Sequence, residues 1–248
     1  MMDVLIGDDV DSSADDLIDF ANQFDITYKH MADRVITRDA LYLSPTQQLG
    51  YLAAHANRVF YPKYPVVNQP VRRSDFSLLQ SFGRCKKGFV LDLTAGFGRD
   101  SYVLYKSGYQ VYSVEKSKIL SAFVYYKMLQ VGTAGQWVSL CGDANQIVSQ
   151  YPVQWQKPDV IYIDPMFEPG LTKGAVQKTA CYLRALAEDS RSIEDNFSAI
   201  LDLAIKRVIV KRAKRSHYIN DQQPTYQLQH NRCRFDVYVV SAKGHETC

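Results

Sequence analysis

The sequence predicts an α/β fold built on a mostly parallel sheet with helices on both faces. Between residues 88 and 215, short apolar segments typical of buried strands alternate with segments of helical periodicity. One apolar segment runs into a glycine turn and then a helix, over residues 90–100, VLDLTAGFGRD. After residue 216 two strand-like segments follow each other closely, which predicts an antiparallel hairpin at one edge of the sheet.

The first 87 residues are expected to form a small N-terminal α/β extension in front of a main domain over residues 88–248. Short strands are predicted at 4–6, 35–36 and 41–43, and Ser12 and Ser13 can cap a helix over the acidic segment behind them. Residues 44–88 contain prolines, tyrosines and arginines, which favours a loop-rich connection. Contact with RNA, through Arg72 and Arg73, is the alternative.

The main domain contains the alternating strands and helices. Its strands are predicted at 89–94, 110–115, 137–141, 159–163 and 207–211, its helices near 99–107, 117–130, 175–189 and 195–205, and its hairpin at 226–229 and 234–240. Strands joined by right-handed helical crossovers lie parallel, and their ligands bind beyond the carboxyl ends of the strands. One site is therefore expected where those ends meet, at Gly96, Glu115, Asp143 and Asp164.

Composition limits the class of protein. The chain has 248 residues, 46% of them hydrophobic, which suffices for a substantial core. No apolar run approaches the roughly 20 residues of a membrane span, and the acidic N-terminus does not resemble a signal peptide, so a cytoplasmic protein is expected. Five cysteines without a CxxC pair, and no histidine cluster, predict reduced thiols and no metal site.

Charge is unevenly distributed along the chain. The net charge is +3, yet residues 1–39 hold ten Asp against three Lys or Arg, which leaves a net charge of +10 on the remainder. Basic residues gather around the predicted strand at 207–211, and those expected to contact RNA phosphates are Lys211, Arg212, Lys214 and Arg215. A solvated strand end is the alternative interpretation of this cluster.

The glycine segment favours a nucleotide-like cofactor. Gly96 and Gly98 allow a tight turn and a close approach of backbone to ligand, and the helix behind them presents free N–H groups. A dinucleotide fingerprint requires a third glycine where Ser101 stands, and no Walker A lysine follows, so nicotinamide and nucleoside triphosphates are disfavoured. Glu115, 19 residues after Gly96, is placed to accept hydrogen bonds from ribose hydroxyls.

A second motif, Asp164-Pro-Met-Phe167, favours S-adenosylmethionine and an amine acceptor. An exocyclic amine conjugated to a base is a poor nucleophile, because its lone pair is delocalised into the ring. A carboxylate and a backbone carbonyl that accept its two hydrogens help that lone pair to localise for attack on a sulfonium methyl. Asp164, the carbonyl of Pro165 and the ring of Phe167, which can stack on a flipped base, supply these groups.

Five segments of the sequence resemble one family: residues 91–100 (LDLTAGFGRD), 114–115 (VE), 162–167 (YIDPMF), 206–212 (KRVIVKR) and 234–238 (RFDVY). Together they are similar to the RsmJ family, bacterial enzymes that use S-adenosylmethionine to methylate the N2 amine of a guanine in 16S rRNA. The resemblance implies a Rossmann-like class I methyltransferase sheet in the main domain. It also implies cofactor contacts at Arg99, Asp100, Glu115, Lys116, Asp143, Ala144 and Asp164.

Within that implied set, Asp100 would reach the methionine amine of the cofactor, Glu115 its ribose, and Asp143 the region of the adenine edge. Lys116 stands where the family has arginine, and it keeps the charge. We add Asp92, Gly96 and Gly98 of the glycine segment to the expected cofactor contacts.

These observations predict a S-adenosylmethionine-dependent rRNA (guanine-N2)-methyltransferase, which transfers the methyl group directly to a flipped-out base of 16S rRNA or of the small ribosomal subunit. Asp164, Pro165 and Phe167 are the expected catalytic residues. An adenine-N6 nucleic-acid methyltransferase and a non-catalytic RNA-binding module of ribosome assembly are the alternatives. A nicotinamide-dependent oxidoreductase is a more distant third, disfavoured by Ser101.

Overall fold

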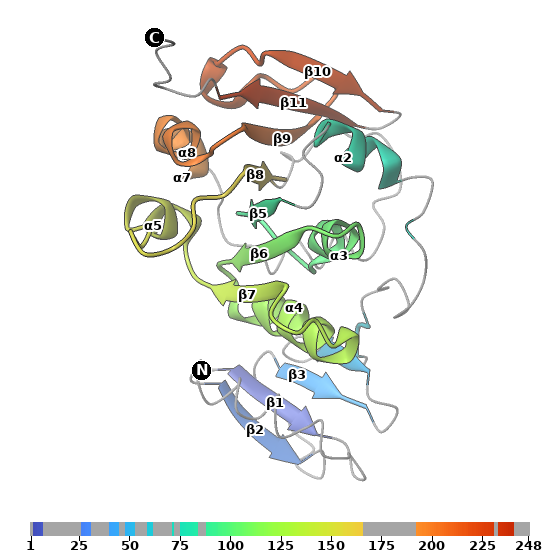
Figure 1. Cartoon of the computed structure of the whole chain (residues 1–248). Coiled ribbons are helices and arrows are strands. Elements are labelled where there is room, and N and C mark those ends of the chain that lie inside the picture. Colours follow the sequence, from blue (N-terminus) through green and yellow to red (C-terminus); the bar gives the residue numbers. More distant parts are fainter. Residues whose placement is uncertain are drawn as a thin grey trace.

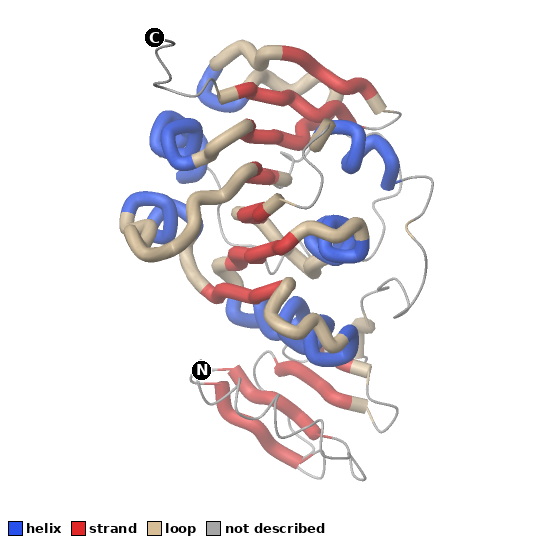
Figure 2. Tube along the Cα trace, viewed as in Figure 1, coloured by secondary structure: helices blue, strands red, loops and turns tan. Residues whose placement is uncertain are grey.

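The computed structural model describes residues 2–6, 26–30, 40–44, 48–52, 59–61, 71, 75–83, 88–165, 192–230 and 233–240. Within these residues the strands form two sheets, one of seven strands and one of four (Figures 1 and 2). The smaller sheet lies next to α4 (Lys118–Val131), at the β7 (Trp137–Cys141) side of the larger one. The helix expected after Ser13, the strand expected at 35–36 and the helix expected at 175–189 lie outside the described residues.

The larger sheet confirms the predicted fold class. Its strand order is β10-β11-β9-β8-β5-β6-β7. Besides β7, its strands are β5 (Phe89–Asp92), β6 (Gln110–Glu115), β8 (Val160–Ile163), β9 (Arg207–Ala213), β10 (Tyr226–Gln229) and β11 (Cys233–Val239). The strands from β9 to β7 pair in parallel, whereas β11 runs antiparallel to both β9 and β10. The hairpin expected at the edge of the sheet is therefore present.

Strand β5 marks the point where the order of the strands reverses. The chain proceeds from β5 outward through β6 and β7, then returns to place β8 on the other side of β5. In open α/β sheets the crevice at such a switch point receives the ligand. The segments that leave β5 and β8 here begin at Leu93 and Asp164, and they belong to the two motifs singled out in the sequence.

Helices cover both faces of the large sheet. One face carries α2 (Phe76–Ser81), α3 (Arg99–Lys106) and α4, and the other carries α5 (Ala144–Ser149), α7 (Ser192–Asp195) and α8 (Phe197–Leu203) (Figure 1). Each face has its own core, in which Phe82, Tyr102 and Trp137 are prominent on the first and Phe197 and Ile200 on the second.

Local sequence explains where the helices begin and end. Ser117 caps α4 by accepting the Leu120 N–H, and Gly132 ends that helix with φ = 65°, a left-handed conformation that glycine adopts without strain. Helix α5 was not predicted, because six residues are too few for a clear helical period, yet Asp143 caps it by accepting the Asn145 N–H at 2.8 Å. Helix α8 lies within the range expected for a helix, 195–205, and the short helix α7, which was not predicted, directly precedes it.

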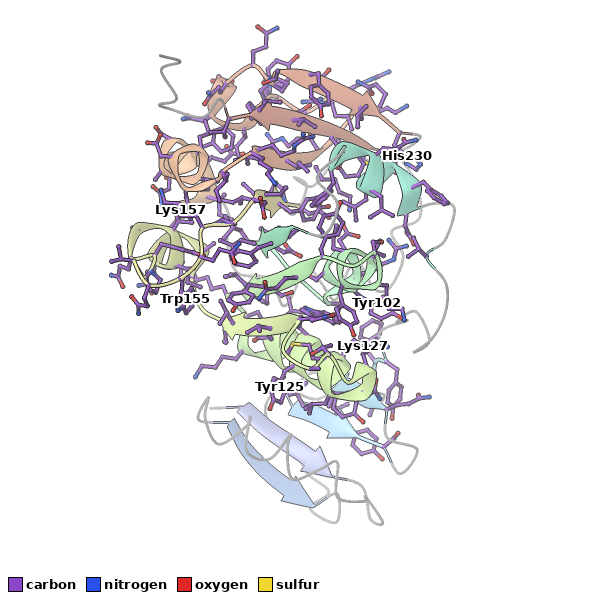
Figure 3. The ribbon with its side chains drawn as sticks, in the orientation of Figure 1. Tyr102, Tyr125, Lys127, Trp155, Lys157 and His230 are labelled. Carbon is purple, nitrogen blue, oxygen red and sulfur yellow. The ribbon has the colours of Figure 1, made fainter. Side chains whose placement is uncertain are left out.

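Lys127 of α4 illustrates how tightly the first face is packed. Its side chain is buried, and its ammonium lies 5.3 Å from the centre of the Tyr102 ring on α3, both labelled in Figure 3. Burial lowers the pKa of Lys127.

No helix within the described part of the chain combines the length and the apolar character needed to cross a bilayer.

The smaller sheet has the strand order β2-β1-β3-β4, formed by β1 (Met2–Ile6), β2 (Ile26–His30), β3 (Ala40–Leu43) and β4 (Leu49–Leu52). Strands β1 and β3 overlap the strands expected at 4–6 and 41–43, whereas β2 and β4 were not predicted. The Phe60 ring, 6.2 Å from that of Phe97, connects this region to the glycine turn. The division at residues 87 and 88 stays a prediction, although Leu78 and Phe82 already belong to the larger core.

Candidate active site

The glycine turn connects β5 to α3. Gly96 and Gly98 both have positive φ, 56° and 72°, and Gly98 is the residue at which α3 begins. A Cβ at Gly98 would lie 3.1 Å from Cγ2 of Val124 and 3.4 Å from the Trp137 ring, so the position has little room for a side chain. Both the backbone conformation and the packing of α3 against its neighbours therefore require glycine here.

Glu115, at the end of β6, supports this turn. One carboxylate oxygen accepts the Gly96 N–H at 2.8 Å, and the other accepts the Ser117 N–H at 2.9 Å. The side chain is buried, and the backbone carbonyl of Val114 accepts the Ala95 N–H at 3.0 Å. Each carboxylate oxygen has a second lone pair, so these bonds are compatible with the expected contact to ribose, which stays a prediction.

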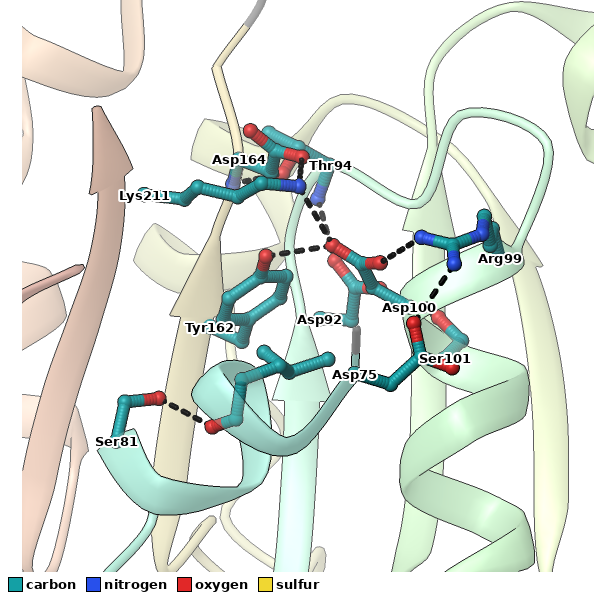
Figure 4. A network of polar contacts seen from close by, with 11 residues as sticks. Asp75, Ser81, Asp92, Thr94, Arg99, Asp100, Ser101, Tyr162, Asp164 and Lys211 are labelled. Carbon is teal, nitrogen blue, oxygen red and sulfur yellow. Dashed lines mark hydrogen bonds and ion pairs between the residues drawn. The ribbon is translucent and has the colours of Figure 1, made fainter. Parts of the chain in front are cut away.

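Three charged side chains meet where β8 ends, beside β9 and at the start of α3 (Figure 4). The ammonium of Lys211 lies 2.6 Å from Oδ2 of Asp164 and 3.0 Å from Oδ2 of Asp100. The Tyr162 hydroxyl donates to the same oxygen of Asp100 at 2.7 Å. Arg99 contributes a longer contact, 3.7 Å from Asp100 Oδ1, and ion-pairs with Asp75 at 2.7 Å.

Strand register explains why these residues meet. Ile163 of β8 pairs with Val210 of β9, so that the next residues along the two parallel strands are Asp164 and Lys211. Asp100 reaches the same point from the first turn of α3, across the glycine turn. The cluster therefore depends on three segments that are far apart in the sequence.

Burial and charge set the protonation of this cluster. Burial raises the pKa of the Asp164 carboxyl, the Lys211 ammonium opposes that rise, and the charge of Asp100 adds to it. For Asp100 burial acts in the same direction, but Lys211 and the Tyr162 hydroxyl outweigh it and lower the pKa. Although burial alone would lower the pKa of Lys211, the two carboxylates raise it above its ordinary value, so this lysine stays protonated.

A chain of buried hydrogen bonds fixes Asp92, the last residue of β5. The Trp137 indole donates to Ser113 at 2.7 Å, Ser113 donates to Ser101 at 2.8 Å, and Ser101 donates to Oδ2 of Asp92. Because an indole N–H can only donate, the direction of the whole chain is set, and Asp92 must accept at its end. Burial raises the pKa of Asp92 to about 7, despite this bond and one from the Thr94 N–H.

Thr94 joins the glycine segment to the second motif. Its N–H donates to Asp92 at 3.1 Å, and its hydroxyl accepts the Asp164 N–H at 2.6 Å. The backbone of Leu93 adds a bond to the carbonyl of Tyr162 at 3.0 Å. The backbone at Asp164 is thus held from β5, and Pro165 behind it is buried.

Other predicted cofactor contacts lie farther along the same sheet edge. Asp143 caps α5 and ion-pairs with Lys116 at 3.3 Å, and Ala144 is buried in the first turn of that helix. Burial opposes ionisation of Asp143, but the Asn145 N–H and Lys116 outweigh it and lower its pKa. Phe167, Arg72 and Arg73 lie outside the described residues.

The four basic residues in and after β9 that were expected to bind phosphates lie in two different environments. Lys211 is turned into the acidic cluster, and Arg212, whose side chain is 13% exposed, bonds Glu194 at 3.0 Å and the carbonyl of His217. Lys211 and Arg212 thus both have acidic partners within the protein, and phosphate contact by either stays a prediction. Lys214 and Arg215 are exposed, so both remain candidates for such contact.

Arg234 of β11 organises the segment that carries Lys214 and Arg215. Its guanidinium donates to the backbone carbonyls of Ala213, Lys214 and Ser216 at 3.1, 2.8 and 2.8 Å. It also contacts the carboxylate of Asp236, which is fully buried, at 2.9 Å. This pair accounts for the arginine and aspartate of the RFDVY segment, which lie on one side of β11.

Sequence reasoning missed three contributors to the site, namely Thr94, Tyr162 as a partner of Asp100, and Lys211 as a member of the acidic cluster. Lys211 had a usable signal, because it directly follows the apolar residues of β9 as Asp164 follows those of β8. Within the part of the chain that the structure describes, no group of three or more His, Cys, Asp or Glu residues is arranged to hold a metal ion.

Known proteins that resemble the chain identify its family. Residues 77–240 match the family model described as "Putative SAM-dependent methyltransferase". The ribosomal RNA small subunit methyltransferase J of Halorhodospira halophila is 30% identical over 185 residues, which cover 71% of this chain and 68% of that protein. The chain belongs to the RsmJ family. The resemblance found in the sequence segments is thereby confirmed.

Two further matches give the extent of the similarity. The RsmJ protein of Aeromonas salmonicida is 33% identical over 161 residues, covering 62% of this chain and 64% of that protein, which is less than two thirds of its length. The crystal structure of a SAM-dependent methyltransferase from Neisseria gonorrhoeae superposes with a TM-score of 0.75 at 20% identity, covering 98% of this chain and 97% of that one. The class I methyltransferase fold is thus confirmed for this RsmJ family member.

Proposed function

We propose that the protein methylates the exocyclic N2 amine of a guanine in 16S rRNA, with S-adenosylmethionine as the methyl donor. The observation that carries the proposal is the arrangement of Asp164. Its backbone is fixed by Thr94 and its Oδ2 by Lys211, while no hydrogen bond from the described residues reaches Oδ1. A carboxylate oxygen held in this way is suited to accept a hydrogen from an acceptor amine.

The residues at the strand ends fit this cofactor, which carries a sulfonium and an ammonium group. Asp92, Asp100, Glu115 and Asp164 bring four carboxyl groups to one edge of the sheet, against the cations of Lys211 and Arg99. We propose that Asp100 holds the ammonium, that Glu115 holds the ribose, and that Lys116, Asp143 and Ala144 contact the adenine end. The bound cofactor supplies an electrophilic methyl group.

Residues of the second motif orient the acceptor. In the proposal, Asp164 and the carbonyl of Pro165 accept the two hydrogens of the amine, so that its lone pair is directed toward the methyl group. As the nitrogen–carbon bond would form and the carbon–sulfur bond break, the positive charge would move from sulfur to nitrogen, where the Asp164 carboxylate would stabilise it until the methylated amine loses a proton to solvent. Phe167 stacks on the base, which must leave its helix to reach this edge of the sheet.

The proposed RNA contacts begin beside the acidic cluster. Lys214 and Arg215 are exposed in the segment that Arg234 fixes, directly after β9 and therefore at the ligand end of the sheet. We add Arg72 and Arg73 to this surface from the sequence. With ribosomal RNA as the substrate, the enzyme would act in the cytoplasm. Binding through these groups would weaken as the salt concentration rises.

Methyl transfer from labelled S-adenosylmethionine tests the proposal directly. The acceptors are undermodified small-subunit particles and naked 16S rRNA, and the products are digested to nucleosides. We expect label in N2-methylguanosine, and we expect Asp164→Ala to lose at least about 100-fold in turnover while it still folds. Asp195→Ala, which removes an exposed carboxylate from α7, is the matched control and should retain activity.

Two results would contradict the proposed function. Label in N6-methyladenosine would retain the fold and the cofactor but replace the acceptor. Absence of label from both acceptors, with cofactor binding measured by calorimetry, would favour the non-catalytic module of ribosome assembly.

A further inference from the structure

Lys211 is the central cation of the candidate active site, although no part of the proposed chemistry requires a lysine. Its ammonium contacts Asp164 at 2.6 Å and Asp100 at 3.0 Å, and its side chain is only 22% exposed. The contact on Asp164 is to Oδ2, which leaves Oδ1 without a hydrogen bond from the described residues. The lysine therefore fixes which oxygen of Asp164 is available to a substrate.

We propose that Lys211 is a positioning residue for the methyl transfer, which holds Asp164 ionised and oriented with Oδ1 toward the acceptor amine. This inference rests on the proposed function, because it assigns Lys211 a role in that same reaction. Lys211 acts through Asp164 and need not touch the substrate.

The need for a cation follows from the two carboxylates. The Oδ2 atoms of Asp100 and Asp164 contact the same nitrogen atom, so the two charges are close enough to repel each other strongly. Like charges that share a site push one of the two groups toward its protonated form, whereas an opposite charge within ~4–6 Å lowers a carboxyl pKa by about 1–3 units. Without Lys211, one of the two carboxyls would take up a proton.

A protonated Asp164 would lose its function. The protonated group carries no negative charge, so it accepts a hydrogen bond from the guanine amine more weakly and no longer stabilises the positive charge that develops on the amine nitrogen. Asp100 has two further partners, Tyr162 and Arg99, that favour its charged form. Asp164 has only Lys211 as a charge partner among the described residues, so it is the more dependent of the two on this lysine.

The remaining charged and titratable groups around the cluster cannot replace Lys211. They are Asp92 on β5, Arg99 and Asp100 on α3, Tyr162 on β8, Cys233 on β11 and Lys214 after β9. Arg99 forms an ion pair with Asp75 at 2.7 Å, and Lys214 is exposed to solvent. The other groups are neutral or acidic, so they offer no positive charge to Asp164.

The dependence of turnover on pH separates this role from a purely structural one. In the wild-type enzyme, activity should fall on the acid side as the carboxyl pair takes up a proton. In Lys211→Met that fall should occur at a pH about 1–3 units higher, with activity recovering at alkaline pH. Lys211→Arg keeps the charge, so the acid limb of its pH–activity profile, where activity falls at low pH, should lie near that of the wild type.

The experiment combines this profile with a measurement that needs no turnover. Carboxyl carbons of ¹³C-labelled aspartate are titrated by NMR in wild type, Lys211→Met and Lys211→Arg, and Asp164→Asn identifies the signal of Asp164. Lys206→Met is the matched control, since Lys206 pairs with Asp159 at 2.6 Å at the opposite end of β9. It should change neither the titration nor the acid limb.

The outcomes distinguish the inference from the function on which it rests. A shift of the Asp164 titration and of the acid limb in Lys211→Met, absent in Lys211→Arg, supports the inference. An unshifted titration in a folded Lys211→Met overturns it, whatever the rate. If the titration shifts but the wild-type protein transfers no methyl group, the electrostatic role of Lys211 stands and the proposed function fails.

Discussion

Replacement of Ser113 by alanine should destabilise the protein far more than the loss of one small hydroxyl suggests. Ser113 lies between Trp137 and Ser101 in the buried chain of hydrogen bonds, with contacts of 2.7 and 2.8 Å. Ser113, Ser101 and Trp137 are all fully buried, so water cannot replace the missing partner. The orphaned indole N–H costs about 1–3 kcal/mol and the lost bond to Ser101 about 1 kcal/mol more. The free energy of unfolding should therefore fall by about 2–4 kcal/mol.

Urea denaturation followed by circular dichroism measures this change, and a double-mutant cycle identifies its cause. In a Trp137→Phe background the indole donor is absent, so Ser113→Ala should cost only about 1 kcal/mol. A Ser113→Ala variant within about 0.5 kcal/mol of wild type, or an additive cycle, would refute the argument that the orphaned indole dominates.

Three further predictions concern charge. Arg234→Met leaves the Asp236 carboxylate uncompensated in the core, so it should lower the free energy of unfolding by about 3–5 kcal/mol, as measured in urea; a loss below about 1 kcal/mol would show that the pair is dispensable. The pKa of Asp92 is about 7 in the folded protein, against an ordinary value of 3.8, so the folded form binds this proton more tightly than the unfolded form does. The stability of wild type relative to Asp92→Asn should therefore fall as pH rises from about 4 to 7. A stability difference between these two proteins that stays constant from about pH 4 to 7 would show that folding does not raise the pKa of Asp92. Lys214→Glu and Arg215→Glu should each weaken binding of 16S rRNA, and each neutralised phosphate contact should reduce the slope of log K against log salt by about 0.7–0.9; an unchanged slope in filter binding would remove these side chains from the RNA surface.

Much of the fold over residues 88–240 could be predicted from sequence, because its signals are local. Buried parallel strands such as β5 and β8 consist mainly of apolar residues, with Asp92 only at the end of β5, and the turn at Gly96 and Gly98 requires positive φ. Helix α5 escaped prediction because it has only six residues. In the smaller sheet, β2 has no apolar run, since polar residues occupy most of the segment ITYKH.

The candidate site was predictable where one segment carries it and not where several meet. Asp164 directly follows β8 and Glu115 is the last residue of β6, so their placement at the sheet edge could be expected from the sequence. The contact of Lys211 with Asp164 and Asp100 depends on the register of β8 and β9, which residue patterns do not specify. The residue pattern likewise does not reveal that Lys211 and Arg212, which were predicted to contact phosphates, have Asp164 and Glu194 as partners.

The hydrogen bonds from Arg234 to the segment after β9 affect how the exposed side chains of that segment can vary. Arg234 donates to four backbone carbonyls of residues 213–217, so the path of this segment is set by a residue on another strand and not by the segment's own side chains. Lys214 and Arg215 can therefore be exchanged, in evolution or by design, without remodelling the turn that presents them. The backbone of this segment is therefore held constant while its exposed side chains can change one at a time.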